Sequence, residues 1–262
     1  MALNGAEYKM ENLKNVGENI SLEPIGNGVE IYVSKNHTFG TDAVLLADFA
    51  DPKKSDRAVD LGTGCGIIPF LWMRDKSLTS AAGLEISKEA VELANKSLEH
   101  NEDIKNLYFF EGDIKNPFTH LGKGAYTLVT CNPPYKASGA GIVSSGEAAI
   151  NARHETLCDL EDVISAAAGL LKFGGRFAMC QRPERLGEIF SLMTSYKIEP
   201  KKLRLVCKSE GCEPWLVLVE GRLGGGKGMR ILPNLNMYKD GKLTDEVLKI
   251  EGAYCSKNQR SE

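Results

Sequence analysis

The sequence lacks several features that would assign a chain quickly to a class of protein. Its seven cysteines form no C-x-x-C pair and have no metal-ligand spacing with the four histidines. No apolar run is long enough to span a bilayer, and the polar N-terminus has no secretory signal. The formal net charge of −3 gives no overall basic field that would attract nucleic acid. These absences predict a cytoplasmic protein with no disulfide scaffold, no metal site and no membrane partner.

The order of the predicted elements indicates one large α/β domain within the 262 residues. Residues 20–34 alternate around a Gly-Asn-Gly turn and predict a β-hairpin, and residues 36–50 change to helical spacing. We divide the chain into an N-terminal extension, 1–50, with this hairpin and helix, and a domain with a C-terminal tail, 51–262. In the domain, strands and helices alternate; the predicted strands are 57–61, 80–86, 107–113, 125–131, 176–181, 201–208 and 215–223, and the predicted helices are 67–76, 87–101, 158–172 and 184–196.

Strands that alternate with helices predict a mostly parallel sheet covered on both faces. The last two predicted strands are separated only by residues 209–214. Because a parallel crossover needs a longer connection, this last pair must be antiparallel. The predicted fold is therefore Rossmann-like, with helices on both faces of a mostly parallel sheet and an antiparallel last strand.

The loop after the first strand of the domain predicts a ligand site. Its sequence, VDLGTGCGII, has Gly62, Gly64 and Gly66, which allow a tight turn and a close approach to a ligand. A dinucleotide fingerprint would have its third glycine at position 67, which is isoleucine here. The loop therefore favours a ligand other than a dinucleotide.

Acidic residues stand at the ends of three successive strands. Asp60 lies just before the glycine loop, Glu85 ends the second strand, and Asp113 ends the third. Carboxylates at this edge of an open α/β sheet accept hydrogen bonds from ribose hydroxyls or from an exocyclic amine. The arrangement suits a nucleoside ligand without a pyrophosphate.

The stretch TCNPPYKA ends the fourth strand of the domain. Asn132 is followed by Pro133 and Pro134, which fix φ and remove two backbone donors. The Asn132 side-chain oxygen and the Pro133 carbonyl remain as acceptors, which suits a planar NH2 group with two hydrogens. Such acceptors can orient the lone pair of this nitrogen through preplaced dipoles, and Tyr135 offers a face on which a base can stack.

These motifs resemble the class I S-adenosylmethionine-dependent methyltransferases, in which VDLGTGCG, GLEI, EGDI and NPPY occur in this order. The resemblance covers residues 40–223 and implies a seven-stranded sheet with an antiparallel last strand. It also implies that Asp60 and the Gly62–Gly66 loop hold the methionine part of the cofactor, S-adenosyl-L-methionine. By the same resemblance, Glu85 binds its ribose and Asp113 its adenine, with Ile86, Ile114 and Asn132 as further cofactor contacts. Phe39 is interpreted as a core residue or as a cover over the cofactor.

Longer stretches, among them 150–167, 174–189 and 231–250, look like the bacterial tRNA adenine-N6 methyltransferases that modify the adenine 3′ of the anticodon in a valine tRNA. This likeness implies tRNA as the partner. Residues 201–230 carry seven Lys or Arg against three Glu, which predicts a phosphate-binding edge at Lys201, Lys202 and Arg204. Arg153 is a further candidate for a phosphate contact, and residues 136–152 for a lid.

Three alternatives stay open at the level of sequence. The same acceptors could serve a protein glutamine N5-methyltransferase, or an N-methyltransferase for another base of rRNA or DNA. A nicotinamide-dependent oxidoreductase is disfavoured by the missing third glycine, and a catalytically silent binding module remains. The sequence leaves the oligomeric state open, either a monomer or a homodimer.

Overall fold

The computed structural model describes residues 20–76, 78–133 and 158–252. Its helices are α2 (Thr41–Phe49), α3 (Ile67–Lys76), α4 (Lys88–His100), α6 (Leu160–Leu170), α7 (Leu186–Ser195) and α8 (Asp245–Glu251), with short 3-10 turns η1 (Pro117–Thr119) and η2 (Pro183–Arg185). Its longer strands are β1 (Ile20–Gly26), β2 (Val29–Ser34), β3 (Arg57–Leu61), β4 (Ser80–Glu85), β5 (Leu107–Glu111), β6 (Tyr126–Cys131), β7 (Leu171–Gln181), β8 (Ile198–Cys207) and β9 (Pro214–Leu223). Four two-residue strands follow: β10 (Arg230–Ile231), β11 (Leu235–Asn236), β12 (Tyr238–Lys239) and β13 (Lys242–Leu243).

The central sheet has the order β10-β8-β9-β7-β6-β3-β4-β5, with β11 also paired to β8. Strands β3 to β7 run parallel to one another. Strand β9 lies between β7 and β8 and is antiparallel to both. The predicted Rossmann-like fold with an antiparallel last strand is confirmed. We call the edge where β3 to β7 end the carboxyl edge, and the edge where they begin the amino edge.

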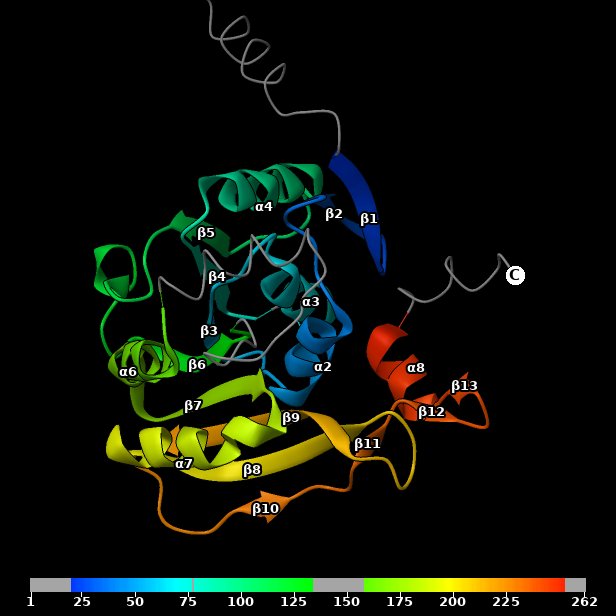
Figure 1. The fold of residues 1–262 in the computed structure, drawn as a ribbon. Coiled ribbons are helices and arrows are strands. Elements are labelled where there is room, and N and C mark those ends of the chain that lie inside the picture. The colour runs from blue at the N-terminus through cyan, green and yellow to red at the C-terminus, as the bar shows by residue number, and fades with distance from the viewer. Residues whose placement is uncertain (1–19, 77, 134–157, 253–262) are drawn as a thin grey trace, which may run out of the picture.

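Helices cover both faces of this sheet (Figure 1). Buried side chains of α2, α3, α4 and α8 form one apolar cluster with one face, and those of α6 and α7 form a second cluster with the other face. Parallel strands buried on both faces read as apolar runs, which is why LVTC in β6 and AVDL in β3 do not alternate. Each cluster excludes water from its face of the sheet.

Helix starts follow local chemistry. Ser87 caps α4 by accepting a hydrogen bond from the Ala90 amide, as its position in the sequence predicts. The Asp159 side chain caps α6 by accepting from the Asp162 amide, and the Asp162 side chain accepts from the Asp159 amide. These two reciprocal hydrogen bonds form a capping box. These caps satisfy amide donors that the first helical turn leaves without partners.

The predicted N-terminal hairpin is present, and it is docked on the domain. The amide of Tyr32 in β2 donates to Ser97 Oγ in α4 at 2.8 Å. Asn101, the C-cap of α4, donates to the Glu30 carbonyl at 2.7 Å. Ile31 and Val33 of the hairpin are buried in the cluster that also contains α3. The extension therefore shares the core of the domain.

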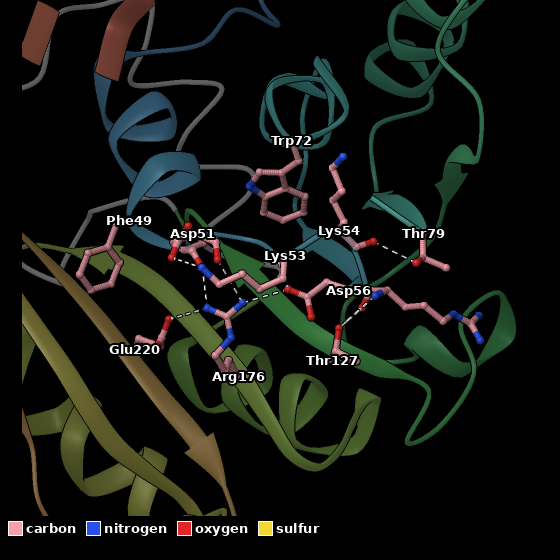
Figure 2. A network of polar contacts seen from close by, with 12 residues as sticks. Phe49, Asp51, Lys53, Lys54, Asp56, Trp72, Thr79, Thr127, Arg176 and Glu220 are labelled. Carbon is pink, nitrogen blue, oxygen red and sulfur yellow. Dashed lines mark hydrogen bonds and ion pairs between the residues drawn. The ribbon is translucent and has the colours of Figure 1, made fainter. Parts of the chain in front are cut away.

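A polar network closes the amino edge of the sheet (Figure 2). Arg176 of β7 donates to Asp56 Oδ2 at 3.0 Å, to Glu220 Oε2 at 3.1 Å and to the Ala50 carbonyl at 2.6 Å. Ala50 is the C-cap of α2, so the guanidinium also satisfies a carbonyl at the end of that helix. The network ties α2 to strands β7 and β9.

Two parts of the chain differ from the sequence-based expectation. The helix predicted over 158–172 ends at Leu170, and strand β7 begins at Leu171 rather than at residue 176. After β9 the chain returns to the sheet, where the short strands β10 and β11, which the sequence did not predict, pair with β8. Strands of two residues are too short to leave a periodic pattern in the sequence.

Candidate active site

A cavity of about 480 Å³ opens at the carboxyl edge, directly after strands β3, β4 and β6. Its wall brings together nine of the predicted site residues: Asp60, Gly62, Gly64, Glu85, Ile86, Asp113, Ile114, Asn132 and Pro133. Ligands of open α/β sheets bind at this edge. A second cavity, of about 300 Å³, lies beside the hairpin turn and the ends of α3 and α8, and none of these residues lines it.

The glycine loop has the left-handed backbone that its sequence predicts. Gly62, Gly64 and Gly66 have φ of 67°, 56° and 86°. A Cβ atom on Gly64 would have no neighbour within 4 Å, so the backbone is open here to an approaching ligand. Gly66 does not line the cavity; a Cβ atom there would lie 2.7 Å from Phe109. Gly66 therefore serves close packing, while the other two shape the cavity.

Glu85 holds this loop in place. Its two carboxylate oxygens accept from the amides of Gly64 and Ser87, each at 2.9 Å. The side chain is largely buried, yet it lines the cavity. A carboxylate oxygen has more than one acceptor site, so Glu85 can still accept hydrogen bonds from two neighbouring hydroxyls of a ligand.

Asp60 is fully buried beneath the loop, and Thr130 donates to its Oδ1 atom at 2.6 Å. Burial raises the pKa of this carboxyl to about 7, against the opposing effect of the Thr130 hydrogen bond and the nearby Thr63 hydroxyl. The Thr63 hydroxyl is buried in the cavity wall near the Asp60 carboxyl.

The cavity wall also has apolar side chains and a further carboxylate. Ile86 and Ile114 line the cavity, and Ile86 is 37% exposed although its neighbours in β4 are buried. Asp113 also lines the cavity, and one of its carboxylate oxygens accepts from the Lys115 amide at 2.9 Å. Its other oxygen is an acceptor of the kind that an exocyclic amine requires.

Asn132 and Pro133 follow β6 and lie in the cavity wall. Asn132 is partly buried, and its Oδ1 atom accepts from the Cys180 thiol in β7 at 3.0 Å. Tyr135, Arg153 and the lid predicted over 136–152 lie outside the described residues. The structure therefore places half of the NPPY segment at the glycine-lined cavity.

The predicted phosphate-binding edge is not brought to the cavity. Lys202 is 15% exposed; it pairs with Glu220 at 3.2 Å and donates to the Phe49 carbonyl at 2.7 Å. Arg204 pairs with Glu246 of α8 at 2.8 Å, and Lys201 donates to a loop carbonyl, that of Gly226. The sequence shows that these side chains are basic, but it could not show the carboxylates and carbonyls that they contact in the fold.

The segment before α2 supplies cavity residues that sequence reasoning missed. Asn36, His37, Thr38 and Asp42 line the cavity, and His37 Nε2 lies 3.2 Å from Ser87 Oγ. Phe39 lines the cavity and also packs against the core, so its core packing is confirmed, while its role as a cover over the cofactor stays a prediction. The sequence suggested a ligand contact only for Phe39; its neighbours in NHTFGTD show a change toward helical spacing and no signal of a binding role.

Two classes of site are not seen in the residues that the structure describes. No three His, Cys, Asp or Glu side chains gather there in a way that could hold a metal ion. None of the helices in 20–76, 78–133 and 158–252 is long and apolar enough to cross a bilayer.

Comparison with solved structures places the fold among methyltransferases. A predicted O-methyltransferase of Agrobacterium tumefaciens superposes with a TM-score of 0.66 at 23% identity, over 80% of this chain and 95% of that one. A geranyl diphosphate methyltransferase in complex with S-adenosylmethionine superposes with a TM-score of 0.52 at 15% identity, over 69% and 84%. Both comparisons support the fold described above.

The chain belongs to the methyltransferase small domain family, whose model matches residues 27–183. Two relatives are each named tRNA1(Val) (adenine(37)-N6)-methyltransferase. That of Cronobacter sakazakii is 28% identical over 69% of this chain and 73% of its own, and that of Porphyromonas gingivalis is 29% identical over 70% and 73%. The match of the family model begins within the hairpin, so the family domain includes residues 27–50 of the N-terminal extension. The predicted methyltransferase class is confirmed.

Proposed function

We propose that this chain transfers a methyl group from S-adenosyl-L-methionine to the exocyclic N6 amine of adenine in RNA, with an anticodon-loop adenine of tRNA as its substrate. The observation that carries the proposal is the position of Asn132, which lies in the wall of the cavity that the glycine loop and Glu85 also line. The names of the relatives supply the tRNA and the base. A tRNA substrate places the reaction in the cytoplasm.

The residues present fit the proposed cofactor. Glu85 offers acceptors for ribose hydroxyls, Asp113 offers an acceptor for the adenine amine, and Ile86 offers an apolar face for its ring. The glycine loop brings backbone amides close to the ligand, and the Thr63 hydroxyl in the cavity wall offers one more polar contact. S-adenosyl-L-methionine, when bound, supplies an electrophilic methyl group on a positively charged sulfur.

Asn132 and the Pro133 carbonyl act on the substrate amine. The lone pair of an adenine amine is delocalised into the ring, so the flat amine is a poor nucleophile. Two acceptors favour a tetrahedral nitrogen and aim its lone pair at the methyl group. The proton that the nitrogen then loses needs no dedicated base, because a methylated amine bearing a positive charge is acidic. Orientation and preplaced dipoles supply most of the rate enhancement.

An anticodon-loop adenine fits this site at low cost. The base is already unpaired, so little stacking energy opposes its entry. Tyr135, which follows the described part of NPPY, is our candidate for stacking on the base, with Arg153 as a candidate phosphate contact. A DNA duplex would add the cost of unpairing.

The proposal is tested with the purified protein, labelled S-adenosyl-L-methionine and total tRNA from a strain that lacks this gene. We expect the label in N6-methyladenosine after digestion to nucleosides. Label in another nucleoside would support methyltransferase activity on tRNA but contradict adenine as the methylated base. Label in protein alone would favour glutamine methylation and contradict the proposal.

A further inference from the structure

Cys180 lies in strand β7, beside the amide proposed to bind the substrate amine. The ladder between β6 and β7 pairs Cys131 with Met179, so Asn132 is level with Cys180 at the carboxyl edge. The Cys180 Sγ atom lies 3.0 Å from the Asn132 Oδ1 atom and donates to it. Cys180 is fully buried and is not part of the cavity wall, whereas Asn132 is. The thiol therefore contacts the amide from within the protein.

The orientation of an asparagine amide decides what it offers to a ligand. One end carries a carbonyl oxygen, which accepts, and the other carries an NH2 group, which donates. The two ends are nearly equal in size, so packing alone distinguishes them poorly. A donor beside one end favours the oxygen there. Because a carbonyl oxygen has two lone pairs, Oδ1 can accept from the thiol and from a substrate amine together.

The surroundings of Cys180 strengthen this effect. Its side chain belongs to an apolar cluster with Ala178, Leu216 and Leu218. A free cysteine packs there as a small apolar residue and keeps a weak S–H donor. In a buried site a hydrogen bond is electrostatically stronger than in water, and the Cys180 thiol is shielded from solvent. A thiol thus supplies a donor at a place where a more polar group would cost more to bury.

We propose that Cys180 is a positioning residue for methyl transfer: its thiol holds the Asn132 side chain with Oδ1 available to the substrate amine. This inference rests on the proposed function, because it gives Asn132 the role of acceptor. Strand β6 then carries two cross-strand side-chain bonds at the carboxyl edge. Thr130 donates to Asp60 on one side, and Asn132 accepts from Cys180 on the other.

Steady-state kinetics with tRNA and S-adenosyl-L-methionine test the role through three variants. Cys180→Ala removes the donor and lowers kcat about tenfold, the kinetic equivalent of one hydrogen bond, with KM for the cofactor within about twofold. Cys180→Ser keeps a donor and restores kcat to within about threefold of the wild type. Cys207→Ala removes another buried thiol of the same sheet and leaves kcat unchanged. Thermal melts of all three variants separate this effect from a loss of folded protein.

A second measurement depends on no substrate. The side-chain NH2 signals of Asn132, assigned by their absence in Asn132→Asp, report its environment in an NMR spectrum of 15N-labelled protein. We expect one sharp pair in the wild type and in Cys180→Ser, and a broadened or doubled pair in Cys180→Ala.

An unchanged spectrum and kcat in Cys180→Ala would overturn the inference, as would a serine variant that fails as badly as the alanine variant. Wild-type protein that methylates no tRNA would instead reject the proposed function, and the amide spectrum would still decide whether Cys180 orients Asn132.

Discussion

The two edges of the central sheet use similar residues for opposite purposes. At the amino edge, Arg176 pairs with Asp56 and Glu220 (Figure 2). Lys202 also pairs with Glu220. At the carboxyl edge, Asp60 and Glu85 lie beside a cavity, and the groups that donate to them are the Thr130 hydroxyl and the amides of Gly64 and Ser87. Charged groups that complete each other stabilise the fold, while polar groups that face a cavity can bind a ligand. The contrast teaches that a residue's partners indicate its role better than its charge does.

The largest effect is expected from the amino edge. Arg176→Met would leave the Asp56 and Glu220 carboxylates buried without their guanidinium, which costs about 3–5 kcal/mol of unfolding free energy. Urea unfolding measures this loss, with Arg222→Met as a control, because that arginine is exposed on β9. Turnover per folded molecule stays unchanged at low temperature. A stable Arg176→Met variant would contradict the structural role of the network.

The next effect belongs to the carboxyl edge and is kinetic. Asn132→Ala removes a preplaced acceptor at the cavity, and we expect kcat to fall by about 10²–10³. The midpoint of unfolding stays near that of the wild type, because Asn132 is only partly buried. Activity assays on tRNA beside thermal melts measure both quantities. A variant with normal turnover would show that the amide does not act in the reaction.

Asp60 gives the third prediction, a dependence of stability on pH. Its folded pKa, about 7, lies above the value of an unfolded aspartate, so the native state binds more protons than the unfolded state between these values. The contribution of protonated Asp60 to the free energy of unfolding is therefore present at low pH, and it is lost as the pH rises through 7. From pH 5 to pH 8 the loss is about 2–3 kcal/mol.

Paired urea unfolding at pH 5 and pH 8 measures this loss in the ligand-free protein. Asp60→Asn keeps an acceptor for Thr130 and cannot ionise, so the difference between variant and wild type isolates the contribution of Asp60. Equal pH dependence in the two proteins would show that the buried carboxyl does not titrate in this range.

The sequence predicts the carboxyl edge better than the amino edge for a physical reason. Parallel strands all end at one edge, so the residue that follows each strand is placed near its counterparts without knowledge of register. Glu85, Asp113 and Asn132 could therefore be grouped from their positions alone. The partners of Lys202 could not, because its carbonyl acceptor, Phe49, is 153 residues away in the chain.

Register limits what a sequence can predict about the site itself. Cys180 meets Asn132 because β6 and β7 pair with Cys131 opposite Met179, and a slip by one residue would separate them. Asn36 and His37 likewise line the cavity only because of the way the segment before α2 crosses the carboxyl edge. Motifs thus indicate which residues gather at the site, while their mutual contacts require the fold.

The smallest predicted effect tests the comparison within one strand. Lys201 lies in the amino half of β8 and already donates to the Gly226 carbonyl, whereas Lys208 is exposed just beyond the carboxyl end of β8. We expect Lys201→Ala to leave tRNA affinity within about twofold. We expect Lys208→Ala to weaken binding and to reduce the salt slope by about one, as the loss of one phosphate contact does. Filter binding from low to moderate salt measures both variants. The reverse result would indicate that RNA binds near the amino edge, with the basic side chains of β8 as its docking surface.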